Sequence, residues 1–167
     1  MGWLSGKTVQ LVGESPAIAT ALQAHGAELI REGDCDILVH FVAAPDEKPV
    51  HELSHAEWRA VLNAGLDQRF FLAREFAAQR RAIGKGGAVI YVGVPEQALG
   101  SDQAAAAGAL VNLTKTLGVE WARDGIRVNA VLTFDRSETL GNLVAYLASD
   151  YAAYVTGAVM GVGLTDG

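Results

Sequence analysis

The sequence predicts an α/β fold, a Rossmann-like doubly wound parallel sheet of about six strands with helices on both faces. Short apolar runs alternate with segments of helical periodicity along the whole chain. The apolar runs are continuous, which is typical of strands buried on both faces. No repeat, low-complexity stretch or linker divides the chain, so residues 1–167 are expected to form one domain with a truncated version of this sheet.

Glycine and proline mark the boundaries of the first elements. The apolar run Lys7–Val12 predicts a strand that ends at Gly13, and the periodicity of Ser15–Gly26 predicts a helix. A brief strand is expected over Ala27–Ile30. The continuous apolar run Asp36–Ala44 then predicts a strand in the centre of the sheet.

A capping box marks the start of the second helical region. Ser54 and Glu57 have the S-x-x-E spacing in which each residue satisfies a backbone N–H of the other. The helix is expected to run to about Arg81, with a break near Gly65, and Ala88–Val94 predicts the next strand.

The second half repeats the alternation of helix and strand. A long helix is expected over Ser101–Arg123, followed by a strand over Ile126–Leu132. Glu138–Ser149 predicts a short helix, and Ala158–Leu164 a final strand. Strands separated in this way by helices pair in parallel.

Composition excludes several classes of function. The chain has 13 Lys and Arg against 19 Asp and Glu, a net charge of −6, so we expect no nucleic-acid binding. No apolar run approaches the length of a membrane span. The single cysteine, Cys35, allows no internal disulfide, and we expect a cytoplasmic protein. Only 19% of the residues are charged, which favours a surface that is partly covered by another subunit.

Two motifs resemble hydrolytic sites but lack what their chemistry needs. His51 and His55 match the zinc motif H-E-x-x-H, but Ser54 is the expected helix cap, which places His51 before the helix. We therefore expect no metal, and new chemistry at His40 or in this histidine loop is only a minor alternative. Ser15 stands in a turn between strand and helix, like a nucleophile elbow, but Pro16 lacks the N–H of an oxyanion hole. We interpret Ser15 and Pro16 as a helix cap and a first-turn proline.

Four segments of the second half carry a family pattern. They are residues 113–122 (LTKTLGVEWA), 124–131 (DGIRVNAV), 147–150 (LASD) and 154–157 (YVTG). With weaker matches in the first half, the chain resembles the short-chain dehydrogenase/reductase family over nearly its whole length. The resemblance implies hydride transfer between a nicotinamide cofactor and a carbonyl or alcohol, with a tyrosine and a lysine as the proton shuttle.

The positions that carry this chemistry in the family hold other residues here. The resemblance places the family's tyrosine and lysine at Gln103 and Ala107, its serine near Val94, and its asparagine at about Gly65. An amide and three apolar residues cannot transfer a proton at neutral pH. We expect no catalytic residue and no dehydrogenase activity in this chain alone.

The expected nucleotide turn is degraded as well. Of the family's glycines only Gly13 is present, Ala17 and Ala19 take the places of the others, and Glu14 adds a negative charge beside the phosphate position. The chain between residues 30 and 36 and between 133 and 137 is also short compared with the family. We expect no cofactor in this chain.

The elements that resemble the family's assembly surfaces are retained. The leading hypothesis is a non-catalytic subunit that pairs, as a heterodimer or heterotetramer, with a catalytically intact NAD(P)-dependent subunit and stabilises it. The alternative is a homo-oligomeric scaffold or small-molecule-binding protein without redox activity, with a ligand beneath Phe41, Tyr91 and Phe134. The expected interface residues are Phe70, Ala106, Leu110, Leu113, Leu117, Trp121, Tyr151, Tyr154 and Met160.

Overall fold

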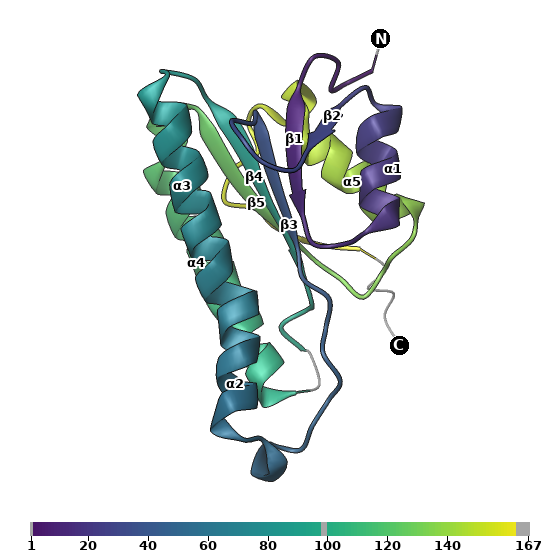
Figure 1. The fold of residues 1–167 in the computed structure, drawn as a ribbon, viewed down its shortest axis with the longest axis vertical. Helices are drawn as coiled ribbons and strands as arrows, with labels where there is room; N and C mark the ends of the chain where they lie inside the picture. Colours follow the sequence, from purple (N-terminus) through teal and green to yellow (C-terminus); the bar gives the residue numbers. More distant parts are fainter. Residues whose placement is uncertain (1, 98–99, 163–167) are drawn as a thin grey trace.

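A computed structural model of the chain describes residues 2–97 and 100–162 (Figure 1). Its centre is one six-stranded sheet of order β2-β1-β3-β4-β5-β6, in which every neighbouring pair is parallel. The strands are β1 (Thr8–Val12), β2 (Glu28–Ile30), β3 (Ile37–Phe41), β4 (Gly87–Gly93), β5 (Ile126–Leu132) and β6 (Val159–Gly161). The predicted doubly wound parallel fold is confirmed.

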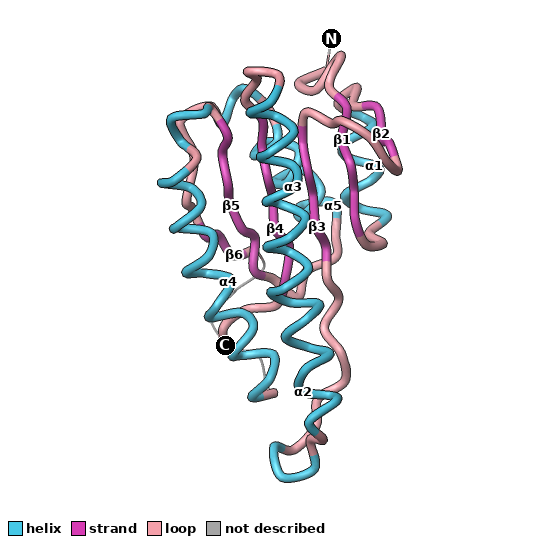
Figure 2. The backbone as a smooth tube through the Cα atoms, turned by 60° about the vertical axis from the view of Figure 1, so that its left-hand side comes forward, coloured by secondary structure: helices cyan, strands magenta, loops and turns pink. Residues whose placement is uncertain are grey.

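Helices cover both faces of the sheet and divide the core in two. On one face lie α1 (Pro16–Ala24) and α5 (Glu138–Ala148), which bury residues such as Leu22 and Val144. On the other lie α3 (Gln68–Ala82) and α4 (Ser101–Glu120), side by side in Figures 1 and 2. Phe76 and Trp121 belong to the core beneath this second pair. All five residues of β3 are buried, as its continuous apolar run predicts.

The second helical region is divided where the sequence predicts a break. The capping box is confirmed, because the Ser54 hydroxyl accepts from the Glu57 N–H and the Glu57 carboxylate accepts from the Ser54 N–H. From there α2 (His55–Leu62) runs into a π-helical segment, Asn63–Asp67, which leads into α3. Such π segments are frequent at functional sites. Figure 1 shows that α2 extends beyond the end of the sheet.

Three predicted ends differ from the structure by three residues, and the other predicted ends agree more closely. The strand predicted over 36–44 ends at Phe41, because the next residues leave the sheet as a loop. The long helix ends at Glu120, and a 3-10 turn, Ala122–Asp124, follows it up to Gly125, whose φ is +68°. In the last predicted strand, only Val159–Gly161 forms β6, and residues 163–164 lie outside the described part.

The histidine and serine motifs are placed as the turn chemistry predicts. His51 lies in a 3-10 turn, Val50–Glu52, before the Ser54 cap, so it does not share a helix with His55. Within residues 2–97 and 100–162, no three metal-ligating side chains form a group. Ser15 occupies the cap position of α1 and Pro16 its first turn, but the Ser15 side chain makes no capping hydrogen bond.

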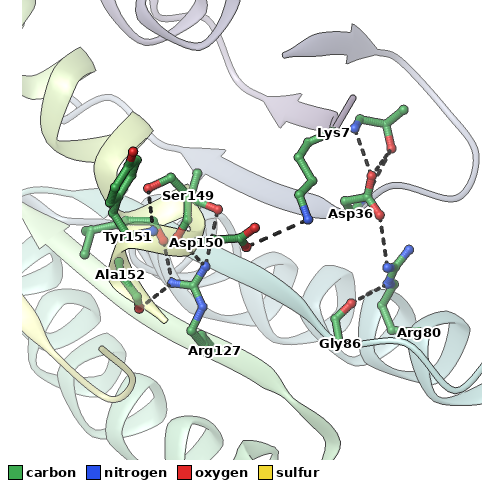
Figure 3. A network of polar contacts seen from close by, with 12 residues as sticks. Lys7, Asp36, Arg80, Gly86, Arg127, Ser149, Asp150, Tyr151 and Ala152 are labelled. Atoms are coloured by element: carbon green, nitrogen blue, oxygen red, sulfur yellow. Dashed lines mark hydrogen bonds and ion pairs between the residues drawn. The ribbon is translucent and has the colours of Figure 1, made fainter. Parts of the chain in front are cut away.

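A polar network ties together the amino-terminal ends of the strands (Figure 3). Arg80 donates to the Asp36 carboxylate at 3.0 Å and to the Gly86 carbonyl at 2.8 Å. Arg127 donates to four carbonyls, those of Leu147, Ala148, Ser149 and Ala152. A guanidinium at the carboxyl end of α5 satisfies carbonyls that the helix leaves unpaired. The guanidinium groups of Arg80 and Arg127 therefore stabilise the fold.

None of the helices in the described part of the chain combines the length and the apolar character that a membrane crossing requires.

Candidate functional site

The four family positions surround one pocket at the end of the sheet where the strands finish. Gly65, Val94, Gln103 and Ala107 all line this pocket, which has a volume of about 220 Å³. They come from three separate elements: the π-helical segment, the loop after β4 and the first turns of α4. Apart from Arg69 and Gln103, every lining residue is apolar.

Close helix packing determines the shape of the pocket at Gly65. A Cβ added at Gly65 would lie only 2.9 Å from the Cβ of Ala106 on α4. Real Cβ atoms do not approach so closely, so the contact between the π-helical segment and α4 requires glycine here. Any side chain at Gly65 would push the two helices apart. This position therefore does not accommodate an asparagine, the residue that the family has here according to the resemblance.

Gln103 and Ala107 form the α4 wall. The Gln103 side chain is 5% exposed, and its Nε2 donates to the Pro45 carbonyl at 3.1 Å, which ties α4 to the loop after β3. Ala107 is 4% exposed and contributes a methyl group. Neither side chain ionises near neutral pH, so this wall offers no group that can give or take a proton.

Arg69 is the feature of the site that the sequence analysis missed. It lies in the first turn of α3 and is 1% exposed. Its Nη1 donates to the His40 carbonyl at 3.2 Å and its Nη2 to the Val92 carbonyl at 2.8 Å. The guanidinium carbon lies 5.7 Å from the centre of the Tyr91 ring. Helical periodicity could have revealed it, because Arg69 lies on the same buried face of α3 as Ala73.

The charge of Arg69 has no carboxylate partner in the described part of the chain. No ion pair there includes Arg69, and its Nε atom meets no acceptor. Burial lowers the pKa of Arg69 to about 10, so the guanidinium still carries its charge at pH 7. An unpaired buried charge is costly, and the two carbonyl oxygens offset only part of that cost.

His40 lies beneath Arg69 on β3 and is 3% exposed. Burial, together with the nearby Arg69 charge, lowers the pKa of His40 to about 4. The ring is therefore neutral at pH 7, and its Nδ1 has no hydrogen-bond partner among the described residues. Its surroundings are those of a core histidine.

The nucleotide position of this fold lies at the switch point of the sheet, between the carboxyl ends of β1 and β3. Gly13, which follows β1, has a φ of +91°, and a Cβ there would lie 2.1 Å from the Phe41 carbonyl oxygen. The Arg136 guanidinium lies 4.9 Å over the ring of Phe41. Gly13 therefore serves close packing of the turn against β3.

The residues of this turn do not fit a pyrophosphate. Glu14 is exposed on it, and Pro16, in the first turn of α1, has no N–H to donate. Ala17 and Ala19 carry methyl groups where the nucleotide fingerprint has glycines. A phosphate here would meet a negative charge and fewer backbone donors than the fingerprint provides.

Three of the expected interface residues are exposed, but four are not. Tyr154 is fully exposed, Tyr151 is 71% exposed and Phe70 is 38% exposed, while Leu113 and Met160 are half-buried. The expectation for the other four is corrected, because their side chains are 2–6% exposed and pack inside the chain's own core. These four are Ala106, Leu110, Leu117 and Trp121.

On α3 and α4, two exposed large apolar residues lie outside the expected interface set. Phe71, beside Phe70 on α3, is 56% exposed, and the two rings meet edge to face with centres 5.3 Å apart. Val119, near the end of α4, is 79% exposed. Both lie on the helix pair that covers one face of the sheet (Figure 2).

Sequence comparison links the chain to a group of oxidoreductases. The family profile described as enoyl-(acyl carrier protein) reductase matches residues 17–135. The chain is 30% identical over 182 residues to cis-4-hydroxycyclohexanecarboxylate dehydrogenase of Sinomonas cyclohexanicum, covering 90% of this chain and 72% of that protein. It is 32% identical over 185 residues to the (2S)-[(R)-hydroxy(phenyl)methyl]succinyl-CoA dehydrogenase subunit BbsC of Thauera aromatica, covering 93% of this chain and 73% of that protein.

Both alignments are longer than the whole chain of 167 residues, so this chain lacks residues inside the matched span. Among solved structures, a short-chain type dehydrogenase/reductase from Mycobacterium marinum has the same fold, with a TM-score of 0.86 at 21% identity over 95% of this chain and 94% of the other. The observed strand order equals the nucleotide-binding order 3-2-1-4-5-6 without its outer strand and with a further strand at the opposite edge. The chain belongs to the short-chain dehydrogenase/reductase family.

Proposed function

We propose that this chain is a non-catalytic subunit of a heteromeric short-chain dehydrogenase/reductase, where it pairs with a catalytically intact NAD(P)-dependent subunit and stabilises it. The observation that carries the proposal is the pocket formed by Gly65, Val94, Gln103 and Ala107. These are the four residues at which the family resemblance expects the catalytic groups, and none of their side chains can transfer a proton near neutral pH.

Hydride transfer to a carbonyl needs a proton donor beside the reacting oxygen. General acid–base catalysis contributes about 10²–10⁴ in rate, and its donor must exchange its proton near the working pH. Within the pocket only Gln103 and Arg69 are polar. The amide of Gln103 does not ionise, and Arg69 holds its proton with a pKa of about 10. Neither side chain can therefore act as the proton shuttle.

The turn between β1 and α1, where this fold binds a nucleotide, also supports the proposal that this chain is non-catalytic. With Glu14 on the turn and Pro16 at the start of α1, the chain lacks the donors and the neutral surface that a pyrophosphate needs. NAD(P) then belongs to the partner subunit, and this chain contributes assembly and stability.

In this proposal, the partner subunit docks on the exposed apolar side chains of α3 and α4. Phe70 and Phe71 are exposed on α3, and Val119 is exposed on α4, in the helix pair that covers one face of the sheet. Aromatic residues are enriched in protein interfaces because they bury much area at little entropic cost. The Thauera aromatica relative is itself named as a subunit of a dehydrogenase, which favours a mixed assembly for this chain too.

Co-expression of this chain with the products of its neighbouring genes tests the proposal. Native mass spectrometry is expected to find a stable complex of both chains, and its mass distinguishes heterodimer from heterotetramer. The catalytic chain expressed alone is the control, and it is expected to melt at a lower temperature than in the complex.

Titration of the isolated chain with NADH and NADPH, followed by nucleotide fluorescence, is the second measurement. We expect no saturable binding. Tight binding of either nucleotide, or recovery of this chain only as a monomer, contradicts the proposal. A homo-oligomer without the partner would instead favour the alternative, a scaffold or small-molecule-binding protein.

A further inference from the structure

The buried guanidinium of Arg69 and the apolar pocket around it carry an inference that does not depend on the partner subunit. We propose that the pocket between α2, the π-helical segment and α4 binds a small carboxylate with an aromatic or alicyclic body, which places its charge at Arg69 and its ring among the apolar walls.

The first step is the unsatisfied hydrogen-bonding capacity of Arg69. Each terminal nitrogen of a guanidinium carries two N–H groups, and here each makes one hydrogen bond, to the carbonyl of His40 or of Val92. The Nε–H has no partner among the described residues. Buried donors are nearly always paired, so this shortfall points to an acceptor that binds from outside the chain.

The second step is the charge balance. Arg69 is 1% exposed, and no carboxylate of the described residues forms an ion pair with it. The neighbouring His40 is neutral at pH 7, so it neither adds a charge nor offsets one. A buried cation of this kind selects a negatively charged ligand, and a carboxylate matches the planar guanidinium with two parallel hydrogen bonds.

The third step is access. Arg69 itself lines the pocket, and its Nη2 would lie 3.1 Å from a Cβ at Gly93, another lining residue. Glycine at this position leaves the guanidinium next to the pocket wall without a side chain between them. The Arg69 side chain therefore forms part of the cavity wall beside Gly93.

The last step is the size and character of the cavity. Its volume is about 220 Å³, and all lining residues other than Arg69 and Gln103 are apolar. An apolar protein cavity of about 150 Å³ is large enough to bind benzene. The pocket therefore has room for a six-membered ring together with a carboxylate. The apolar walls exclude a small hydrophilic anion as the preferred ligand, because they offer its remaining oxygens no donors.

Isothermal titration with three probes of one shape tests the inference: benzoate, benzyl alcohol and benzylammonium. We expect benzoate to bind at least tenfold more tightly than benzyl alcohol, the ratio typical of one hydrogen-bonded charge contact. Benzylammonium is expected to bind most weakly. Absence of saturable benzoate binding, or benzoate binding no tighter than the alcohol, overturns the inference.

Two variants locate the site. Arg69→Met keeps the apolar stem, and it is expected to reduce benzoate affinity to that of benzyl alcohol while leaving the alcohol unchanged. Arg74→Met, an exposed position on the same helix, is the matched control and should bind like the original chain. Val61→Phe narrows the pocket from α2 and is expected to weaken all three probes.

If Arg69→Met does not fold, the ranking of the three probes and the effect of Val61→Phe still decide. Binding of benzoate that is unaffected by Val61→Phe places the ligand elsewhere and overturns the assignment.

Discussion

Replacing both exposed phenylalanines of α3 by aspartate tests the proposed docking surface directly. Phe70 is 38% exposed and Phe71 is 56% exposed in the free chain. With roughly 200 Å² for each side chain, the pair leaves about 190 Å² of apolar surface in water. At roughly 25 cal/mol per Å², full burial against a partner contributes about 5 kcal/mol. Burial of half this surface contributes about 2 kcal/mol, or about a thirtyfold change in Kd.

The double variant Phe70→Asp/Phe71→Asp is therefore expected to weaken the mixed complex by at least thirtyfold, measured by surface plasmon resonance on the immobilised catalytic subunit. Because both side chains are on the surface, the free energy of unfolding of the free chain should change by less than about 1 kcal/mol. Phe134→Asp is the control, since Phe134 is 53% exposed on the loop between β5 and α5. If the double variant binds the partner as tightly as the original chain does, the helix pair is not the docking surface.

Three further changes test the turn, the core and the pocket. In urea unfolding, Gly13→Ala is expected to lower the free energy of unfolding by about 3 kcal/mol or more, and Gly6→Ala by about 1 kcal/mol. Both glycines have a positive φ, but only a Cβ at Gly13 would meet backbone atoms. Equal losses would refute the close approach of Gly13 to the Phe41 carbonyl. Since burial and the Arg69 charge lower the pKa of His40 to about 4 in the folded state, stability should fall as pH drops from about 6.5 towards 4, by about 2 kcal/mol between pH 7 and pH 5. His40→Leu should remove this part of the pH dependence in urea titrations, and an unchanged slope would show that His40 is not its source. The double variant Gln103→Tyr/Ala107→Lys is expected to remain unable to bind NADH, because the turn between β1 and α1 is unaltered. Saturable enhancement of NADH fluorescence by this variant would contradict the proposal that the partner subunit alone binds NAD(P).

The periodicity of apolar residues was sufficient to predict the strands and most of the helices. β3 and β4 are recognisable because strands buried on both faces are apolar throughout. The start of α2 follows from the capping box, a local interaction between Ser54 and Glu57. The end of β3 was predicted less well, because the apolar residues after Phe41 form a loop that lines the pocket.

The interface expectation shows where periodicity stops being informative. Leu110 and Leu117 lie on the apolar face of α4 and Trp121 directly follows the helix, and all three pack in the chain's own core. Sequence pattern shows that a helix face is apolar but does not show which surface covers it. Phe71 and Val119, two further exposed apolar residues of this helix pair, carry no pattern that separates them from core residues.

By itself, the sequence determined the family and the parallel sheet and predicted that the proton-transfer residues are missing, because each depends on the identity of residues at fixed spacing. Only the tertiary structure showed that Gly65, Val94, Gln103 and Ala107 surround one cavity. It also showed that Arg69 is a buried part of the cavity wall and has no carboxylate partner among the described residues. These are contacts between segments far apart in the chain. Their energies depend on burial and on the distance between charges, and neither quantity is encoded in local pattern.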